Sequence, residues 1–295
     1  MSNHYRAGAL VTADALVTVT PEQAGWTYSG LEVFDLGTGP VARALDGIEG
    51  VLVPLSATDL QVTVDGDTHT LRGRKGVFEA ITDWMYLPLG SEVEVRAATG
   101  EVALCTARAS ERFPLRVTAA EDVKVEVRGG GCASRQVTNI ATPDSFPGAD
   151  RINVCEVLTP GGNVSSWPPH RHDGIGDCGP TNEEIYYFRM GQLDAPHGHP
   201  HGQGLFRVYT VDGASDETVT VLDGDVHIVA AGYHGPSTAQ PEYPMYFLNV
   251  LAGPGAERTM AFCDDPDHHW IRESWVELGQ DPRLPMTSAT GRVVR

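Results

Sequence analysis

Three histidines and one glutamate in the second half of the chain have the types and spacing of metal ligands. His170 and His172 lie two residues apart in SSWPPHRHD. Residues i and i+2 of an extended strand point to one face, so both imidazoles can reach one ion. Glu184 follows in EEIYYFRMG, and His234 lies in the turn AGYHGP. Three imidazoles and one carboxylate suit zinc, manganese, iron or nickel and leave positions open for a substrate.

The segment EEIYYFRMG predicts which of its side chains join the histidines. Side chains alternate between the two faces of a strand. One face carries Glu184, Tyr186 and Phe188, and the other carries Glu183, Ile185 and Tyr187. Tyr186 is therefore expected on the same face as the carboxylate ligand.

The elements that position these ligands are predicted to be short β-strands. The 33 glycines and 20 prolines separate short runs rich in Val, Thr, Tyr and Phe, such as DLQVTVDG, EVEVRAATG and GLFRVYTVDG. Long segments with helical periodicity are scarce, which favours an antiparallel sandwich or barrel over a βαβ fold. We therefore predict an all-β protein.

A weak similarity between the two halves predicts two domains of similar fold. DLQVTVDG followed by KGVFEAITDWMYLPLGSEVEV in the first half corresponds to EEIYYFRMG followed by LDGDVHIVAAGYHGP in the second. The linker ERFPLRVTAAEDVKVEVRGGGCASRQV separates them, so we place the domains at residues 1–120 and 121–295. The four candidate ligands all belong to the second domain.

The charge of the chain restricts its partners. The formal net charge is −18, from 21 Lys and Arg against 39 Asp and Glu. A field of this sign repels phosphate backbones and anionic lipid headgroups, so we expect no nucleic-acid partner and no membrane partner. An anionic metabolite would need a metal or a few arginines to make its site locally positive. No leader-like segment and no apolar run of about 18 residues is evident, and we expect a cytoplasmic protein.

The five cysteines are predicted to be reduced thiols. Their number is odd, their spacing is wide and no CxxC pair is present. This pattern argues against a disulfide framework and against a cysteine zinc site.

The ligand pattern resembles the cupin superfamily, whose first motif has HxH, then Glu, then six residues and glycine. Glu184 is followed by six residues and Gly191, which selects Glu184 over Glu183 as the ligand. The second cupin motif resembles the stretch from Gly224 to His234. This chain departs from the pattern in the eleven residues between His172 and Glu184, DGIGDCGPTNE, where cupins have three or four, and in having alanine where proline is common.

With these departures the chain resembles a narrower family, the bacterial 5-deoxy-glucuronate isomerases of inositol catabolism. The matching stretches are WPPHRHD, EEIYYFRM, GLFRVYT, DGDVHIVAAGYHGP, MYFLNVLAGP and FCDDPDHHWI. The resemblance implies two tandem cupin domains, of which the N-terminal one is degenerate and has lost its ligands. It also implies one divalent metal ion per chain, with zinc, manganese and iron left open.

The resemblance further implies an aldose–ketose isomerisation of a sugar acid. In that reaction 5-deoxy-D-glucuronate becomes 5-dehydro-2-deoxy-D-gluconate through a cis-enediolate that a metal stabilises. A base must move the proton between neighbouring carbons. Glu184 is the nearest candidate for this base, and Tyr186 could serve as acid or hydrogen-bond donor.

The carboxylate of such a substrate needs a cation in a chain of this charge. Arg207 in LFRVYT is the first choice, because a guanidinium matches a carboxylate with two parallel hydrogen bonds. Tyr209 would share the strand face of Arg207. In the tail, Asp265, His268 and Trp270 match the family's DDPxHxWI and are expected to close the site or bind the neighbouring domain.

A denser histidine cluster, His197, His199 and His201 in DAPHGHPHGQG, is not predicted to bind the metal. Its glycines and prolines oppose a regular strand and hence a fixed ligand geometry. The loop could cover the mouth of the site.

The ligands by themselves leave other functions open. A cupin dioxygenase with ferrous iron, a ketol-isomerase for a related deoxy-uronate and a non-catalytic sugar-acid-binding cupin all use similar residues. The long loop between HxH and Glu disfavours the related deoxy-uronate isomerase. Association through strand edges into a homo-oligomer is expected for the class.

Overall fold

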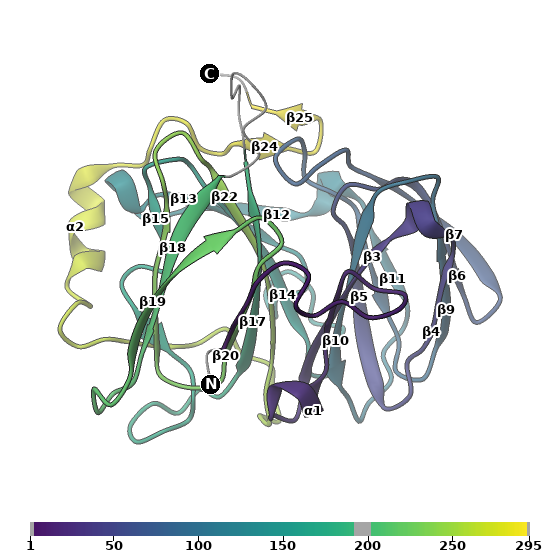
Figure 1. The fold of residues 1–295 in the computed structure, drawn as a ribbon, viewed down its shortest axis with the longest axis horizontal. Coiled ribbons are helices and arrows are strands. Elements are labelled where there is room, and N and C mark those ends of the chain that lie inside the picture. The colour runs from purple at the N-terminus through teal and green to yellow at the C-terminus, as the bar shows by residue number, and fades with distance from the viewer. Residues whose placement is uncertain (1–2, 192–201, 294–295) are drawn as a thin grey trace.

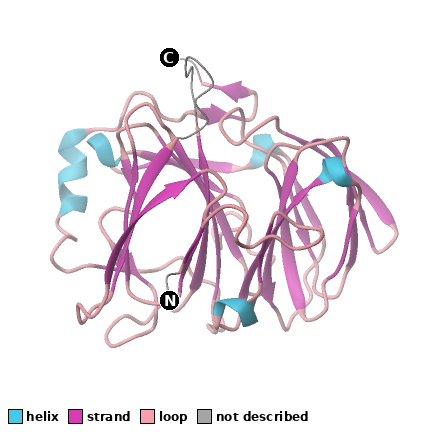
Figure 2. Ribbon diagram, in the orientation of Figure 1, coloured by secondary structure: helices cyan, strands magenta, loops and turns pink. Residues whose placement is uncertain are grey.

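The computed structural model describes residues 3–191 and 202–293, and most of its regular structure is β-strand (Figures 1 and 2). The helices are α1 (Pro21–Ala24) and α2 (Ile271–Leu278), and 3-10 turns span Leu36–Thr38, Ala120–Asp122 and Gly131–Ala133. The prediction of an all-β fold is confirmed. Among the described residues, no helix is both long and apolar enough to cross a membrane.

The first half of the chain folds into two antiparallel sheets. One has the order β11-β8-β5-β10-β3-β2, and the other has the order β4-β9-β6-β7. Their bounds are β2 Val17–Val19, β3 Ser29–Asp35, β4 Val41–Ala44, β5 Ile48–Pro54, β6 Thr58–Val64, β7 Asp67–Gly73, β8 Trp84–Leu87, β9 Glu92–Arg96, β10 Glu101–Arg108 and β11 Arg116–Thr118.

The second half repeats this arrangement with two larger sheets. One has the order β1-β20-β17-β22-β14-β13-β12, and the other follows β19-β18-β21-β16-β23, with β15 also paired to β21. Their bounds are β1 His4–Tyr5, β12 Lys124–Arg128, β13 Arg135–Asn139, β14 Asn153–Thr159, β15 Val164–Ser165, β16 His170–Arg171, β17 Glu183–Met190, β18 Gln203–Tyr209, β19 Asp216–Leu222, β20 Val226–Val229, β21 Tyr233–Ala239, β22 Met245–Ala252 and β23 Cys263–Asp264. A small hairpin of β24 (Thr287–Ser288) and β25 (Gly291–Arg292) follows near the C-terminus.

The N-terminal strand crosses from the first half to the second. β1 pairs with β20, so that His4 lies opposite His227. The side chain of Asp225 accepts hydrogen bonds from His4 Nε2 at 2.9 Å and from the backbone of Ala7 at 2.9 Å. Residues 4–5 therefore belong to the sheet of the second half, whereas residues 17–118 supply the sheets of the first.

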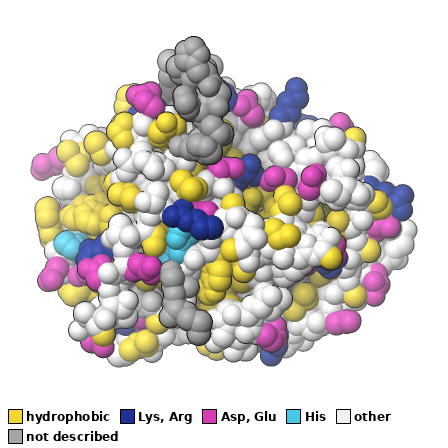
Figure 3. Space-filling view, in the orientation of Figure 1, with side chains coloured by type: hydrophobic (Ala, Val, Ile, Leu, Met, Phe, Trp, Pro, Cys, Tyr) yellow, Lys and Arg dark blue, Asp and Glu magenta, His cyan; other side chains and the backbone are white. Residues whose placement is uncertain are grey.

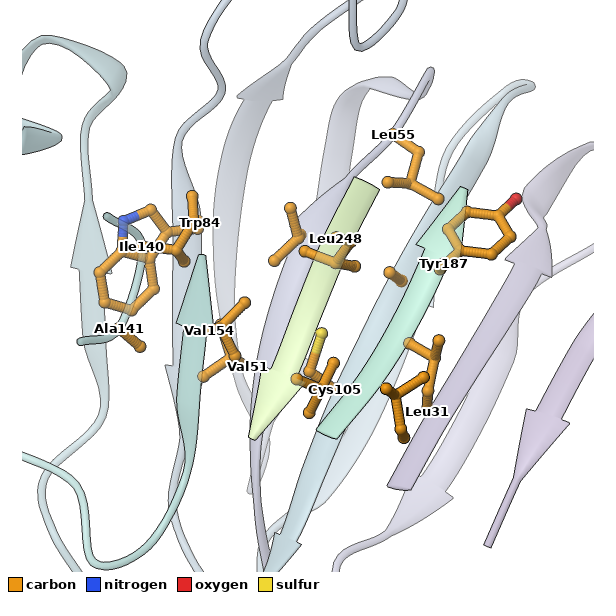
Figure 4. Packing of buried hydrophobic residues seen from close by; sticks show 14 of the residues in the cluster. Leu31, Val51, Leu55, Trp84, Cys105, Ile140, Ala141, Val154, Tyr187 and Leu248 are labelled. Atoms are coloured by element: carbon orange, nitrogen blue, oxygen red, sulfur yellow. The ribbon is translucent and has the colours of Figure 1, made fainter. Parts of the chain in front are cut away.

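The largest hydrophobic cluster lies between the two halves (Figure 4). Leu31, Val51 and Cys105 from the first half pack in one cluster with residues of β14, β17 and β22 from the second. Two further clusters fill the interiors of the halves, one in each. A common core of this kind makes the folding of one half depend on the other, since apolar burial is the main stabilising term.

A buried ion pair also joins the halves. The Arg74 guanidinium donates to both carboxylate oxygens of Glu156 on β14, and both side chains are almost inaccessible to water. Tyr246 donates its hydroxyl proton to the same carboxylate at 2.7 Å. The pair is fully hydrogen-bonded, which is what a buried charge requires.

Candidate metal centre and substrate cavity

Three of the four predicted ligands converge inside the second half. Glu184 Oε2 lies 3.0 Å from His172 Nε2 and 3.1 Å from His234 Nε2. One ligand atom from each of these residues lies within 4.8 Å of the others, and all three are buried. The glutamate comes from β17 of one sheet, whereas the histidines come from the opposing sheet, in β21 and just after β16. The interior of the β-sandwich thus brings them together.

His170 lies beside this group, at the start of β16. Its backbone pairs with His234 in the sheet, and the two ring centres are 4.5 Å apart. Its Nδ1 is 3.2 Å from the carbonyl oxygen of Pro168, so Nδ1–H can donate there and leave Nε2 as a ligand. The ring centres of His170 and His172 are 6.3 Å apart.

The polar atoms of the group fit a divalent cation. Among the described residues, neither ring nitrogen of His234 has a hydrogen-bond partner of acceptable geometry, although both are buried. Such orphaned groups cost stability unless something satisfies them, and a metal ion would satisfy Nε2. His172 Nδ1 lies 2.8 Å from the carbonyl oxygen of Asn182, which fixes the ring and directs Nε2 inward, as metal-binding histidines usually require.

The electrostatics of Glu184 and His170 favour ligand protonation states, whereas Glu184 outweighs burial and raises the pKa of His172. Burial alone would raise the pKa of the Glu184 carboxyl, but His234 and His172 outweigh it and hold that pKa well below its usual range. Burial, reinforced by His234 and His172, lowers the pKa of His170 well below its ordinary value. A carboxylate and a neutral imidazole are the forms that bind metals.

A cavity of about 270 Å³ opens beside the ligands and is lined by His170, His172 and Glu184. Its volume is near the lower end of small-molecule pockets, at roughly 300 Å³. Apolar side chains such as Val157, Phe247 and Met260 form part of the wall. Such a mixture of apolar walls and a few polar groups is typical of a ligand site.

Tyr186 and Ser166 add hydroxyl groups to this cavity. The two oxygens are 3.3 Å apart. Burial, together with the charge of Glu184, raises the pKa of Tyr186 well above its ordinary value, so its hydroxyl keeps its proton. Ser166 has φ of +48°, in the left-handed region, which is an uncommon conformation for serine and one found at functional sites.

Sequence comparison identifies the family. The model of the KduI/IolB family matches residues 5–271 of the chain. The chain belongs to the KduI/IolB family.

Curated relatives match this family member along most of its length. The 5-deoxy-glucuronate isomerase of Geobacillus kaustophilus is 40% identical over 271 residues, which cover 90% of this chain and 93% of the relative. That of Bacillus subtilis strain 168 is 37% identical, with 86% and 92% of the two chains covered.

Solved structures show the same fold. An IolB-like protein from Salmonella typhimurium LT2 superposes with a TM-score of 0.80 at 34% identity, covering 91% of this chain and 98% of that one. Bacillus subtilis oxalate decarboxylase, described with Mn(II) centres, superposes with a TM-score of 0.57 at 14% identity, covering 84% and 74%. The second likeness concerns the fold alone, and it supports the cupin architecture.

In this KduI/IolB-family chain, Arg207 and Tyr209 lie outside the cavity lining. The Arg207 guanidinium donates two hydrogen bonds to the partly exposed Asp216, at 2.8 and 2.7 Å. It also lies 4.1 Å from the centre of the Tyr209 ring, as expected for neighbours on one strand face. Tyr209 donates to the Asp265 carboxylate. The geometry therefore does not support Arg207 as the ligand of a substrate carboxylate.

The tail segment packs beside the predicted metal ligands, but His268 does not line the cavity. The His268 ring lies 5.5 Å from that of Trp167, and neither residue lines the cavity. The backbone of Asp265 donates to Pro169 at 2.9 Å, directly before the HxH pair. The tail contributes to the cavity through other residues that the sequence did not single out, namely Phe262, Arg272 and Trp275.

The prediction that all cysteines are reduced thiols is wrong for two of them. Cys178 and Cys263 form a disulfide, whereas Cys105, Cys132 and Cys155 are free. Cys178 lies in the long loop between His172 and Glu184, and Cys263 lies in β23, which pairs with β16. They are 85 residues apart in sequence, so only the pairing of these two distant segments brings them together.

The cavity-lining residues that were not predicted from the sequence carry little signal there. Ser166 stands inside the motif SSWPPHRHD, four residues before His170, but serine is common in loops. Arg135 and Arg272 come from segments without a recognisable motif and meet only in the folded chain. The histidine cluster at 197, 199 and 201 lies outside the described residues.

Proposed function

We propose that this protein is a 5-deoxy-glucuronate isomerase, which converts the aldose 5-deoxy-D-glucuronate into the ketose 5-dehydro-2-deoxy-D-gluconate. The observation that carries the proposal is the match to isomerases of that name at 37–41% identity over most of both chains. The buried His and Glu group beside a cavity of small-metabolite size supports it. In this reading the partner of the protein is a small sugar acid.

One divalent ion per chain would be held by His170, His172, Glu184 and His234, and zinc, manganese and iron all accept such ligands. When bound, the ion would draw electron density from the aldehyde and the neighbouring hydroxyl of the substrate, which makes the proton at C2 easier to remove. The placement of His172 by Asn182 supports this ligand set.

The residues of the chain would move the proton. The reaction takes a proton from C2 and returns one to C1, while the hydroxyl proton passes from O2 to O1. Glu184 is the carboxylate that lines the cavity among the described residues, and we assign to it the transfer between the two carbons. The Tyr186 hydroxyl, paired with Ser166, would donate a hydrogen bond to the oxygen that gains negative charge.

The test follows the reaction directly. Metal-loaded protein is incubated anaerobically with 5-deoxy-D-glucuronate, and proton NMR follows the aldehyde signal. Conversion to a ketose is expected, and it should be lost in His170→Ala/His172→Ala. His69→Ala, in β7 of the first half, is the control expected to retain activity.

Each other outcome identifies an alternative. A requirement for dioxygen would indicate a cupin dioxygenase, and conversion of a related deoxy-uronate alone would change the substrate. Binding of the sugar acid without turnover, with zinc, manganese and iron all tried, would indicate a non-catalytic cupin. Retention of activity in the double variant would contradict the proposed metal site.

Cytoplasmic location and homo-oligomerisation stay predictions. A disulfide is uncommon in the cytoplasm, so the Cys178–Cys263 pair makes the location worth testing by cell fractionation.

Figure 3 shows hydrophobic side chains gathered over α2, and Val276 and Leu278 there are 88% and 61% exposed. Light scattering on the purified protein would give the oligomeric state.

A further inference from the structure

Three arginines from three separate elements line the cavity that holds the metal ligands. Arg128 ends β12, Arg135 begins β13 and Arg272 lies in α2. In a chain with a net charge of −18, such a local gathering of guanidinium groups is unexpected on composition alone. It supplies the positive site that an anionic ligand would need.

Two of these arginines are already neutralised. Arg128 Nη2 lies 2.6 Å from Glu126 Oε2. Arg272 Nη2 lies 2.6 Å from Asp264 Oδ1. Their donors and charge are largely used by the protein itself.

Arg135 forms no ion pair or hydrogen bond with a carboxylate among the described residues, and Asp264, already paired with Arg272, acts on it only at longer range. The one hydrogen bond of Arg135 with the described residues runs from Nη1 to the carbonyl oxygen of Ala133 at 3.1 Å, although a guanidinium has five N–H donors. Its guanidinium carbon lies 5.3 Å from the centre of the Trp275 ring. Burial lowers the pKa of Arg135 to about 10, and the like charges of Arg272 and Arg128 contribute. A desolvated cation without an ion-pair partner is costly, and an anion bound in the cavity would offset that cost.

The backbone around Arg135 is shaped to hold it in place. Gly129 has φ of +92°, and a Cβ there would lie 2.0 Å from the Ala133 oxygen and 2.9 Å from Arg135 Nη1. A Cβ on Gly130 would lie 2.7 Å from the Cα of Trp275. Only glycine allows this close approach of the turn, the guanidinium and the α2 segment. The Arg135 guanidinium is therefore packed closely between this turn and the α2 segment in the cavity wall.

We propose that Arg135 binds the carboxylate of the substrate and so selects a sugar acid over a neutral sugar of the same length. This inference rests on the proposed isomerase function and adds its specificity determinant. The metal ligands and Arg135 line one cavity, so a six-carbon chain can place its aldehyde end at the former and its carboxylate at the latter. The planar guanidinium offers the two parallel N–H groups that a carboxylate accepts.

The experiment compares two substrates on matched variants. The substrates are 5-deoxy-D-glucuronate and 5-deoxy-D-glucose, in which a hydroxymethyl group replaces the carboxylate. Arg135→Met should lower kcat/KM for the uronate by about 100-fold, the loss expected for a charge-assisted pair, and change it for the neutral sugar by less than about threefold. Arg135→Lys should recover part of the preference. Arg207→Met tests the alternative, because the sequence predicted Arg207 as the ligand of the substrate carboxylate.

Three results would overturn the inference. They are an equal loss on both substrates in Arg135→Met, an unchanged uronate rate in that variant, and a selective uronate loss in Arg207→Met. The first would indicate a structural role of Arg135, and the last would restore Arg207 as the carboxylate ligand.

A binding measurement separates this inference from the proposed function. Calorimetric titration of the metal-loaded protein with D-gluconate and with neutral D-glucitol requires no turnover. If the wild-type protein isomerises neither 5-deoxy-D-glucuronate nor 5-deoxy-D-glucose, the proposed function fails. Selective loss of gluconate binding in Arg135→Met would still support an anion site at Arg135, whereas equal gluconate affinity in both proteins would contradict it.

Discussion

Glu183 and Glu184 are neighbours in the chain but act on opposite faces of β17. The Glu183 carboxylate accepts hydrogen bonds from the backbone N–H groups of residues 27, 28 and 29, at 2.6, 2.7 and 2.8 Å. Glu184 points into the second half and contacts His172 and His234. One strand thus joins the two halves on one side and supplies a proposed metal ligand on the other.

Replacing Glu183 by glutamine should therefore affect stability, whereas replacing Glu184 should affect metal binding and activity. Glu183→Gln weakens three charge-assisted hydrogen bonds and should lower the free energy of unfolding by about 1–3 kcal/mol, with metal content retained. Glu184→Gln should reduce metal content and lower kcat at least about 100-fold. Urea unfolding, elemental analysis and the NMR assay measure these effects. Loss of metal in both variants would contradict the division of roles.

The Cys178–Cys263 disulfide should stabilise the loop that precedes Glu184. Arg171 also anchors this loop through Asp173 and Asp177, each at 2.8 Å. Cys263→Ser should lower the free energy of unfolding by about 2–4 kcal/mol and weaken metal retention. Cys132→Ser, at an exposed free thiol, is the control.

A thiol count tests the same disulfide independently. The unfolded, unreduced protein should titrate three thiols, those of Cys105, Cys132 and Cys155. Five titratable thiols would restore the original sequence prediction.

Gly235 should be essential to the shape of the cavity. It has φ of +107°, and a Cβ there would lie 1.8 Å from the carbonyl oxygen of Ser166, beside the cavity and next to His234. Gly235→Ala is therefore expected to displace Ser166 and lower kcat by more than tenfold, in addition to losing stability. Gly213→Ala is the matched control, because Gly213 has φ of +71° with nothing within 4 Å. Equal effects of the two substitutions would show that backbone strain alone accounts for the loss.

Lowering the pH should destabilise the folded protein by protonating Glu126, the ion-pair partner of Arg128. Burial acts to raise the pKa of Glu126, but Arg128, Asn139 and Lys124 outweigh it and lower that pKa from 4.5 to about 2. The folded form thus favours the carboxylate, so its contribution is complete above pH 4.5 and is lost as pH falls toward 2.

Urea unfolding of the wild type and Glu126→Gln checks this pH dependence. The difference in unfolding free energy between them should be constant from pH 7 to 5 and should shrink at pH 3. The control is Glu94→Gln, which removes an exposed pair with Arg96 in the first half. A difference that grows on acidification would contradict the assignment.

The sequence by itself determined the fold class and predicted a metal-ligand set, of which His172, Glu184 and His234 converge in the structure. Alternation in EEIYYFRMG placed Glu184 and Tyr186 together, and the structure buries Tyr186 in the interior of the second half and Tyr187 in the core between the halves. Strand periodicity and ligand spacing are local, so they can be read from neighbouring residues. His170, His172 and His234 were predicted as ligands for the same reason, because motif spacing reflects the geometry of adjacent strands.

Only the tertiary structure decided which arginine faces the cavity and which cysteines meet. Arg207 stands in a recognisable strand but is paired with Asp216, whereas Arg135 has no motif and lines the cavity. Cys178 and Cys263 are joined because β23 pairs with β16. Contacts between distant segments depend on the packing of whole sheets and on which charges find partners there, and local sequence patterns do not contain that information.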